Sequence, residues 1–487
     1  MSAPEEPRPR GAGAWIREHR TGVLAVGLSA VFVLIAAGVF AAGYASVARA
    51  TPAPTVSARA SVSPTPTVRP TPASIPAPTR LRTCSIAATA SDPRLGTLQG
   101  QVVNAATGEV LFDRRGGAPA RTAGLVQVLT AASALAVLGP DYRIPTSVVD
   151  LGGGAIAIVG RGDPTLSRTP VGSESVYAGA PKLADLAAQT IAAWTAKHPG
   201  QRITALTLDD SYWDDADAWD PTWPESARTR GDQSQATALQ VDGDRDNPFV
   251  QQSPRSSDAV GRAGDLVTAA LRAADPGAVV AESLQVTRGK APTSAPPLAE
   301  VLSQPVSTLL PQMLASGDNT LAEMLARISS VQAGAGGTAA SLGAVIVKAL
   351  SAYELPTDGI ALRDGSGVSP EDAVPPRYLA QLMIKVDGGA QNLDVLRDGL
   401  PIAGESGSLQ TRFTGTAAEP RGKVTAMTGR SADVEALSGV VDARDGTALG
   451  FAFSALGAGI GDSAGGAAAL DALIAAVYAC GDNLAGT

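Results

Sequence analysis

The sequence has very few histidines, cysteines and lysines, and each shortage excludes a class of chemistry. His19 and His198 are the two histidines of the chain, so neither a Ser-His-Asp triad nor a histidine-rich metal site is expected, and we expect both rings to be solvated. The net charge is −8 and charged residues make up 17% of the chain, which gives no electrostatic reason to expect nucleic-acid binding. No cofactor and no metal are predicted. The 487 residues are 45% hydrophobic, which is enough to bury a large core.

The two cysteines stand near the two ends of the segment that we expect to fold. Cys84 and Cys480 lie far apart in the sequence, which excludes a C-x-x-C redox or zinc motif. If the protein is exported, a disulfide between them is the natural interpretation. The alternative is a pair of buried free thiols.

Charged residues are missing between Thr21 and Ala48, where the chain is almost wholly apolar. About 20 such residues span a bilayer as a helix. Arginines precede this segment, and the positive-inside rule then places the N-terminus in the cytoplasm. We therefore predict a cytoplasmic tail (1–20), a transmembrane anchor (21–48) and an extracytoplasmic main domain in a single-pass protein of the cell membrane. The alternative is a signal peptide, because Ala48-Arg49-Ala50 resembles a cleavage site.

In residues 49–82 prolines alternate with small residues, and large apolar side chains are few. Such a sequence cannot bury a core, and it favours polyproline II, which rises about 3.1 Å per residue. This segment is predicted to be a semi-rigid extracytoplasmic linker, with the folded part beginning near Leu81.

The rest of the chain carries clear secondary-structure patterns. A hairpin is predicted over 98–116 around the turn "NAATGE", and a buried apolar helix from about Ala123 to Leu138, where Gly139-Pro140 stops it. "SGDNTLAEMLARISS" (316–330) predicts a helix with a polar entry. The stretch 422–457 predicts antiparallel strands with a "DARDG" turn, and 467–480 a closing helix.

Seven strings in this order resemble one family of enzymes. They are "VVNAATGEVLFDRRG", "VLTAASALAVLGPDYRIPT", "GRGDPTLS", "LDDSYWDD", "DNTLAEML", "LRDGSGVSP" and "GESGSLQTRF", and they span about residues 90 to 480. Each string alone is weak, but seven in sequence are specific. The chain resembles the D-alanyl-D-alanine carboxypeptidase/endopeptidases, the class C low-molecular-mass penicillin-binding proteins of the penicillin-binding protein 4 type.

The resemblance implies an α/β fold of the α+β kind, with an antiparallel sheet flanked by helices. The penicillin-binding (transpeptidase-like) domain would be discontinuous, formed by 83–146 and 300–487, with accessory structure inserted over 147–299. In such a domain the N-terminal strand and the C-terminal helix are neighbours, which makes a Cys84–Cys480 bond plausible.

Three motifs carry the acyl-transfer chemistry of that family. In S-x-x-K the serine attacks the D-Ala-D-Ala carbonyl, and the lysine one helical turn along takes its proton. S-x-N supplies a second hydroxyl and an amide. K-T-G aims a cation and a hydroxyl at the terminal carboxylate of the substrate.

The resemblance places these motifs on residues that cannot perform that chemistry. The serine and lysine of the first motif fall on Gly124 and Gln127, and the serine of the second falls on Gly317, while Asn319 is kept. The lysine of the third falls on Met427, with Thr428 and Gly429 kept. The sequence therefore predicts a cleft with the fold of the family and with four of its reactive side chains replaced.

No other part of the sequence restores the motifs. None of the six lysines has a serine three residues before it or Thr-Gly or Ser-Gly after it, and no asparagine has a serine two residues before it. Ser316 adjoins Gly317, but a shift of one residue redirects its side chain. Arg430 is the one nearby cation that we keep as a candidate carboxylate partner, although three residues along a strand turn it to the opposite face from Met427.

We therefore expect a membrane-anchored pseudo-enzyme of peptidoglycan metabolism that binds the peptidoglycan stem peptide or a cell-wall assembly protein. One alternative is an active serine-type D-Ala-D-Ala carboxypeptidase/endopeptidase with an unconventional nucleophile, and another is a purely structural partner of a wall enzyme. The acidic aromatic stretch 209–225, "DDSYWDDADAWDPTWPE", could stack on sugar or bind a cationic partner. Its tryptophans could instead pack on the domain.

Overall fold

The structure is a computed structural model that describes residues 81–485. The predicted tail (1–20), the predicted anchor (21–48) and nearly all of the predicted linker (49–82) lie outside the described residues. Within the described part the strands form two five-stranded sheets and one two-stranded sheet. The mixture of antiparallel strands and helices agrees with the expected α+β class.

The first sheet joins the two ends of the described chain. Its strand order is β10-β11-β12-β1-β2, and every neighbouring pair is antiparallel. The strands are β1 (Thr97–Asn104), β2 (Val110–Arg114), β10 (Val424–Ser431), β11 (Val434–Asp442) and β12 (Ala448–Leu456). The predicted N-terminal hairpin and the predicted C-terminal strands are both confirmed.

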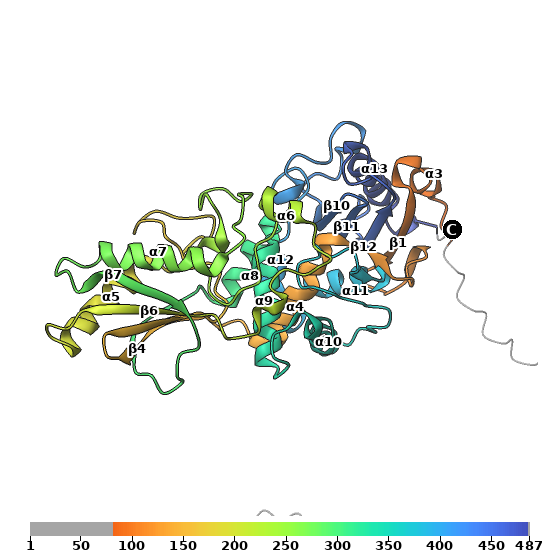
Figure 1. The fold of residues 1–487 in the computed structure, drawn as a ribbon. Helices are drawn as coiled ribbons and strands as arrows, with labels where there is room; N and C mark the ends of the chain where they lie inside the picture. The colour runs from red at the N-terminus through yellow and green to blue at the C-terminus, as the bar shows by residue number, and fades with distance from the viewer. Residues whose placement is uncertain (1–80, 486–487) are drawn as a thin grey trace, which may run out of the picture. The chain divides into compact units, whose positions relative to one another are not determined.

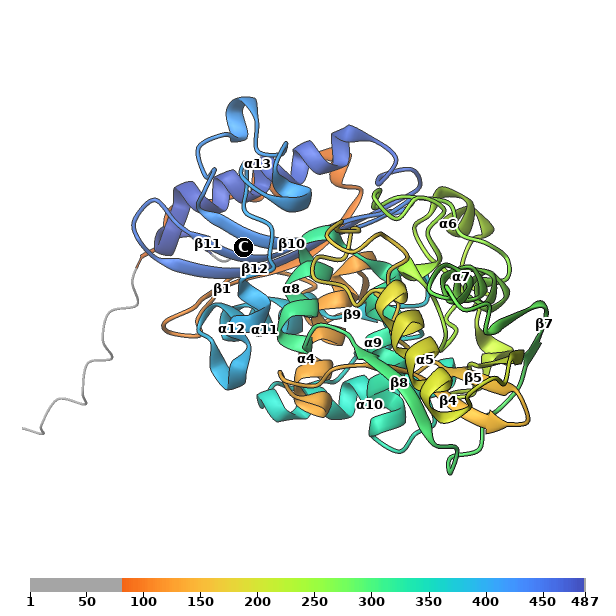
Figure 2. The ribbon, with the colours of Figure 1, turned by 90° about the vertical axis from the view of Figure 1, so that its left-hand side faces the viewer.

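Helices cover both faces of this sheet (Figures 1 and 2). On one face α13 (Ala464–Cys480) and α3 (Ala87–Ala90) pack over a core that includes Phe112, Phe451 and Phe453. On the other face lie α11 (Pro376–Asp387) and the helices around α4. Both faces of the sheet are therefore covered, and β11 and β12 are buried along nearly their whole length.

Helix α13 confirms the predicted closing helix. Within residues 81–485, the helical stretch Ala464–Asn483 is the one long and apolar enough to cross a membrane, with a hydropathy of 1.5 over its most apolar window. Half of that window is buried against the rest of the protein, so its apolar character reflects core packing on the sheet.

Helix α4 (Val126–Leu138) lies at the centre of the second core layer. Its sequence is rich in alanine and leucine, which favour helix, and it has no glycine or proline inside. Residues 126–135 are buried on every side, among α8 (Val306–Ser316), α9 (Asn319–Gln332) and α10 (Ala339–Leu350). The predicted helix is confirmed, except that its first turn is a separate 3₁₀ turn, η2 (Ala123–Leu125).

The second sheet comes entirely from the middle of the chain. Its order is β7-β6-β5-β4-β8, and it is mixed, since β5, β6 and β7 are parallel whereas β4 is antiparallel to β5 and β8. Helices α5 (Leu183–Lys197) and α7 (Ala259–Ala273) contribute to the core beside it. The strands are β4 (Pro145–Gly152), β5 (Ala155–Val159), β6 (Ile203–Asp209), β7 (Val280–Arg288) and β8 (Pro297–Leu302).

Short elements connect the larger ones. They are β3 (Ala120–Arg121), β9 (Ala373–Val374), α6 (Glu225–Arg230), α12 (Asp394–Arg397), and the 3₁₀ turns η1 (Pro93–Leu95), η3 (Asp215–Asp217), η4 (Asp242–Asp244), η5 (Ser351–Tyr353), η6 (Ala390–Asn392), η7 (Gly407–Leu409), η8 (Gly415–Ala417) and η9 (Gly481–Asn483).

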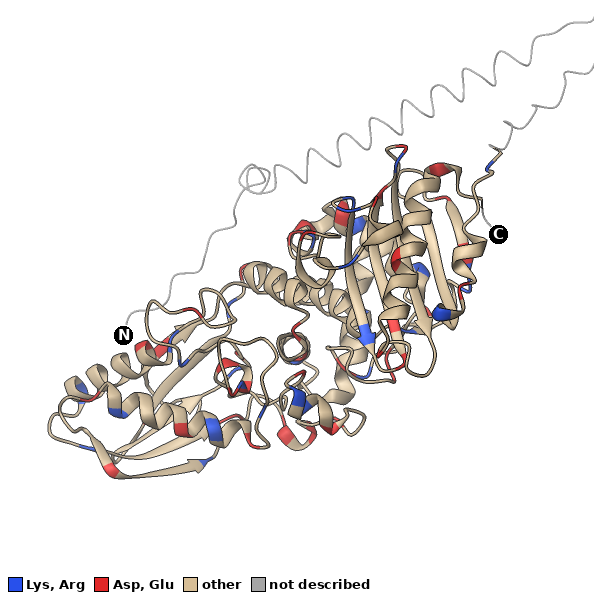
Figure 3. Cartoon of the chain, turned by 90° about the horizontal axis from the view of Figure 1, so that it is seen from above, with Lys and Arg blue, Asp and Glu red and all other residues tan. Residues whose placement is uncertain are grey.

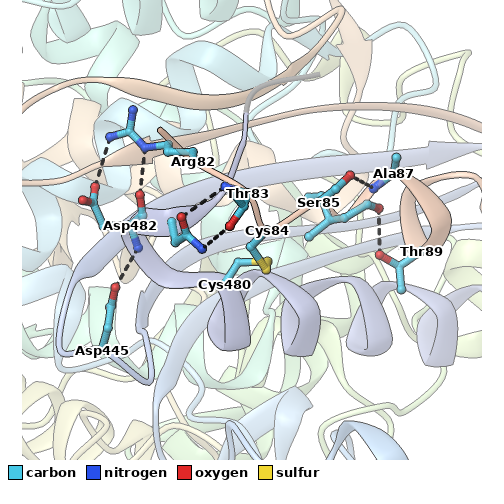
Figure 4. Close-up of a disulfide and its surroundings, with 11 residues drawn as sticks. Arg82, Thr83, Cys84, Ser85, Ala87, Thr89, Asp445, Cys480 and Asp482 are labelled. Carbon is cyan, nitrogen blue, oxygen red and sulfur yellow. Dashed lines mark hydrogen bonds and ion pairs between the residues drawn. A yellow bond between two sulfur atoms is a disulfide. The ribbon is translucent and has the colours of Figure 1, made fainter. Parts of the chain in front are cut away.

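A disulfide joins Cys84 to Cys480, across a sequence separation of 396 residues (Figure 4). The two Cα atoms are 5.4 Å apart. Around the bond, Cys84 N donates to Asn483 O at 3.1 Å, and Arg82 Nε donates to Asp482 O at 2.8 Å. The predicted disulfide is confirmed, and the alternative of two free thiols is wrong.

The environment of one histidine differs from the sequence expectation. His198 follows α5 and is not simply solvated, because its Nε2 lies 2.7 Å from Asp150 Oδ2 and its ring centroid is 4.3 Å from that of Trp194. A carboxylate and an aromatic ring therefore hold the imidazole in place. His19 lies outside the described residues. Basic and acidic residues are otherwise interspersed over the helices and loops (Figure 3).

Candidate functional site

The start of α4 brings the first and third motif positions together. Gly124 lies in η2, where β10 passes so closely that a Cβ on Gly124 would be 3.4 Å from the carbonyl oxygen of Thr428. The same Cβ would be 3.9 Å from Gln127 Nε2. A side chain at position 124 would therefore stand beside the nitrogen of residue 127, which is the relation that a nucleophile and its base require.

Gln127 links the first motif position to the second. Its side chain is 1% exposed, and its Nε2 donates to Asn319 Oδ1 at 2.7 Å. Asn319 Nδ2 in turn donates to Asp232 O at 3.1 Å, which fixes the orientation of both amides. The side-chain oxygen of Gln127, Oε1, is also buried and has no hydrogen-bond partner among the described residues. A buried amide thus occupies the position of the motif lysine and supplies neither a positive charge nor a base.

Gly317 closes α8 as its C-cap and has φ +65°, in the left-handed region. A Cβ there would meet nothing within 4 Å, because the position opens onto a pocket of about 480 Å³ lined by Ser316, Gly317 and Asn319 among others. Ser316 does not replace a lost serine, since its Oγ donates back to Gln312 O at 2.7 Å. The sequence expectation for Ser316 agrees with this geometry.

The left-handed backbone makes Gly317 a conformational requirement as well as a motif position. We expect Gly317→Ala to lower the free energy of unfolding by about 1 kcal/mol, because a Cβ in the left-handed region carries a steric cost that glycine avoids. Urea unfolding followed by circular dichroism measures this change. Gly334→Ala, at another open glycine with φ +78°, is the matched control and should lose a similar amount. An unchanged or higher stability of Gly317→Ala would contradict the expectation.

The third motif position lies on β10, against η2. Met427 is 2% exposed and belongs to the core formed with α4, α8 and α9. A Cβ on Gly429 would be 2.0 Å from Thr122 O, so glycine is needed for β10 to approach η2. Thr428 Oγ1 lies 2.8 Å from Ser408 Oγ. Thr428 and Gly429 therefore lie against η2, whereas the Met427 side chain is buried in the core.

Arg430, the candidate carboxylate partner, lies away from the cleft. Its side chain is 58% exposed, and its Nε donates to Gly461 O. The same Nε lies 3.9 Å from Glu435 Oε2. The strand geometry expected from the sequence turns it to the other face, and the structure agrees. Arg430 is therefore not placed to meet a ligand at position 427.

Beside Asn319 lies a buried ion pair that the sequence did not reveal. Asp318 Oδ1 caps α9 through Leu321 N at 3.0 Å, while Asp318 Oδ2 lies 2.8 Å from Arg245 Nη2. Both side chains are buried, at 3% and 0% exposure. Burial alone raises the pKa of Asp318, but the Arg245 and Arg255 guanidiniums outweigh it and lower that pKa to about 2. The aspartate is therefore held as an anion.

The "RDGSGVSP" loop supports the cleft from behind. Asp364 accepts from the backbone nitrogens of Ser366 at 2.9 Å and Ser369 at 2.8 Å. Burial and the Asp364 carboxylate raise the pKa of Asp372 well above its usual range. Burial also raises the pKa of Glu323, on α9, to about 7. These carboxyl groups organise backbone amides and face the interior of the protein.

The acidic aromatic stretch 209–225 packs on the domain. Trp213 and Trp223 are each 4% exposed, and Trp223 Nε1 donates to Asp364 Oδ2 at 2.6 Å. Trp219 is only partly buried and meets Trp223 edge-on, with ring centroids 5.3 Å apart. Of the two interpretations, the structure favours packing, and a stacking surface built on Trp213 and Trp223 is wrong. Within residues 81–485, no group of three or more His, Cys, Asp or Glu side chains could hold a metal ion.

Comparison with known proteins fits this arrangement. The model of the D-Ala-D-Ala carboxypeptidase 3 (S13) family matches residues 82–254 and 250–477, which together cover most of the chain. The chain belongs to this family. The carboxypeptidase Rv3627c of Mycobacterium tuberculosis is 34% identical over 407 residues, which cover 82% of this chain and 84% of that protein.

Two further proteins are similar to most of the chain. The D-alanyl-D-alanine carboxypeptidase of Actinomadura sp. (strain R39) is 31% identical over 449 residues, with 76% of this chain and 79% of that protein covered. The crystal structure of penicillin binding protein 4 from Haemophilus influenzae superposes with a TM-score of 0.64 at 18% identity, covering 78% of this chain and 95% of that chain. The latter similarity supports the penicillin-binding fold.

Proposed function

We propose that this S13-family chain is a catalytically inactive, membrane-anchored protein of peptidoglycan metabolism that binds the stem peptide or scaffolds a cell-wall assembly protein. The membrane anchor is the predicted helix 21–48, with the main domain extracytoplasmic. The domain limits 83–146 and 300–487, with 147–299 inserted, are part of the same proposal. The family, and a relative named D-alanyl-D-alanine carboxypeptidase, support the peptidoglycan assignment.

One observation carries the inactivity. Position 124 stands beside the side-chain nitrogen of residue 127 and beside β10, yet the residues there are Gly124 and Gln127. Glycine has no nucleophile, and an amide cannot accept the proton of a hydroxyl. In a serine peptidase, loss of the nucleophile or the base costs on the order of 10⁶ in rate. Loss of both leaves no route to an acyl-enzyme.

The alternative of an unconventional nucleophile has one candidate near the cleft. Ser408 Oγ lies 2.8 Å from Thr428 Oγ1. A second hydroxyl is not a general base at neutral pH, so this contact does not activate Ser408. Buried Ser366 is engaged through its Oγ, which accepts from Val368 N at 3.3 Å.

The test is acylation by a reactive β-lactam. We would incubate the full-length protein in detergent with the β-lactam and measure its intact mass, beside a variant carrying Gly124→Ser, Gln127→Lys, Gly317→Ser and Met427→Lys. No adduct on the native protein is the expected result. A stoichiometric adduct would overturn the proposal, and peptide mapping, with Ser408→Ala as the matched variant, would then identify the nucleophile.

A binding measurement separates the two forms of the proposal. Isothermal titration of the native protein with a soluble muropeptide is expected to show saturable binding if the cleft still receives a stem peptide. Absence of saturable binding would leave the scaffolding role, in which another wall protein is the partner.

A further inference from the structure

Strand β7 forms one edge of the second sheet, and no strand of the described residues pairs with its outer side (Figure 2). From Glu282 to Arg288 every residue is exposed except Leu284, which is partly buried. The opposite edge, β8, is shorter, with six residues against nine, and it begins with Pro297. A long exposed edge without proline is a template on which another strand can add.

Backbone groups at alternate residues of β7 point away from β6. Gly289 N donates to Leu208 O, and Arg288 is the residue in register with Leu208. In a parallel ladder this turns the amide groups of the odd-numbered residues toward β6 and those of the even-numbered residues toward the open edge. The carbonyl of Glu282 agrees, because it accepts from the side chain of Arg272 on α7, at 2.9 Å.

The sequence of this edge is complementary to itself in the antiparallel direction. Two copies of "ESLQVTR" (282–288), paired about Gln285, match acid with base, apolar with apolar and hydroxyl with hydroxyl. Cross-strand pairs of these kinds stabilise antiparallel sheets. The matched pairs are Glu282 with Arg288, Leu284 with Val286, and Ser283 with Thr287.

The backbone fits the same register. The pairs Glu282–Arg288 and Leu284–Val286 join even-numbered residues, whose N–H and C=O groups point outward, so the two members of a pair can exchange two hydrogen bonds. Gln285 then lies opposite itself in a non-hydrogen-bonded pair, in which Cα atoms are about 4.5 Å apart. A shift by one residue would set outward groups against inward ones.

The charged side chains of the match are accessible. Glu282 is exposed, and its carboxylate forms no ion pair with any described residue. Arg288 is 45% exposed and pairs with Asp258, which is 61% exposed. An exposed pair of this kind contributes little, so Arg288 can also meet a second carboxylate. Val286, at 44% exposure, would lose water against Leu284 of a second copy.

We propose that β7 is a self-association edge, at which two copies of this chain pair antiparallel about a two-fold axis through Gln285. The second sheets of the two copies then form one continuous sheet. Such a contact uses the same surface on both copies, so it closes as a dimer and does not propagate. Its area is small, and the dimer is therefore expected to be weak and concentration-dependent.

A cysteine at the two-fold axis tests the register directly. The two cysteines of the chain are already joined, so an introduced thiol is the free one. Full-length Gln285→Cys protein in detergent, treated with oxidised glutathione, is expected to give a covalent dimer on a non-reducing gel, because the paired Cα atoms lie within disulfide reach.

Thr287→Cys is the matched control for this cross-link. The two copies of residue 287 would be four residues out of register, which is roughly 14 Å along the strand and beyond disulfide reach. Covalent dimer from Gln285→Cys but little from Thr287→Cys would support the register. No dimer from Gln285→Cys, or an equal amount from both variants, would overturn it.

Charge reversal tests the contact without a cross-link, by sedimentation velocity of the full-length protein in detergent. Glu282→Arg or Arg288→Glu alone sets like charges opposite each other at two places in the dimer. We expect either variant to raise the dissociation constant about tenfold, and the two changes together to restore it. Circular dichroism checks that each variant is folded.

A second pair of variants distinguishes this edge from other sources of association. Val286→Lys should weaken the dimer, whereas Leu302→Lys on β8, where the native side chain is 45% exposed against 44% for Val286, should leave it unchanged. A native protein that stays monomeric at the highest concentration would contradict the proposal. A dimer that responds to none of the β7 variants would contradict it as well.

Discussion

Replacing Arg245 with methionine is expected to lower the free energy of unfolding by about 3–5 kcal/mol, because it leaves a buried carboxylate without its partner. Arg245 Nη2 lies 2.8 Å from Asp318 Oδ2, and neither side chain is appreciably exposed. Arg245 also donates to Tyr177 Oη at 2.7 Å, so the substitution removes a second buried hydrogen bond. Denaturant unfolding of the full-length protein, followed by circular dichroism, measures the change.

Two comparisons isolate the buried charge in this prediction. Arg444→Met breaks an exposed pair with Glu419, whose side chains are 54% and 52% exposed, and should cost less than about 1 kcal/mol. Asp318→Asn in the Arg245→Met background should recover part of the loss, because it removes the unpaired charge. A loss for Arg245→Met no larger than that for Arg444→Met would contradict the prediction.

The same pair predicts the acid limb of the stability curve. The pKa of Asp318 is about 2 in the folded protein, against about 3.9 for an unfolded aspartate. Since the folded pKa is the lower one, the stabilisation is complete above about pH 4 and is lost as the pH falls toward 2. Arg245→Met should flatten this part of the curve, which unfolding measurements between pH 2 and 5 would show.

Removing the disulfide is the second large effect expected. Cys84→Ala together with Cys480→Ala should lower the free energy of unfolding by about 2–4 kcal/mol, since the bond closes a very long loop and restricts the unfolded chain. The bond spans 396 residues of sequence. Thermal and denaturant unfolding of the double variant against the native protein give the measurement.

Reduction provides the control for this second prediction. Dithiothreitol should lower the stability of the native protein to about that of the double variant and leave the double variant unchanged. If the native protein were equally stable with and without reductant while its thiols were shown to be reduced, the disulfide would not be a stabilising link.

Local composition was enough to predict the buried helix α4 and the point at which it ends. The alanine- and leucine-rich run 126–138 has no alternative to a buried helix, and the Gly139-Pro140 stop follows from backbone restrictions. The order of the motif strings then placed residues 124, 127, 319 and 428 at one cleft, and the structure brings these positions together. Family order, more than any single string, carried that prediction.

The long-range polar contacts could not be predicted in the same way. Arg245 and Asp318 are 73 residues apart, and Asp318 stands at the polar entry of a predicted helix, with no local sign that it pairs with Arg245. The hydrogen bond between Gln127 and Asn319 joins positions 192 residues apart. The burial of Trp223 depends on its bond to Asp364, which likewise has no local signal. Partner choice between distant polar residues is a property of the tertiary structure.

If the proposed N-terminal anchor holds the protein, the disulfide has a mechanical consequence. Tension applied at Leu81 reaches Cys84 almost immediately and passes through a covalent bond to the end of α13. Strand β1 begins after this junction, at Thr97, and is hydrogen-bonded along its length to β12. A pull on the N-terminal side would therefore load α13 and its packing on the sheet, and β1 would not be unzipped one hydrogen bond at a time.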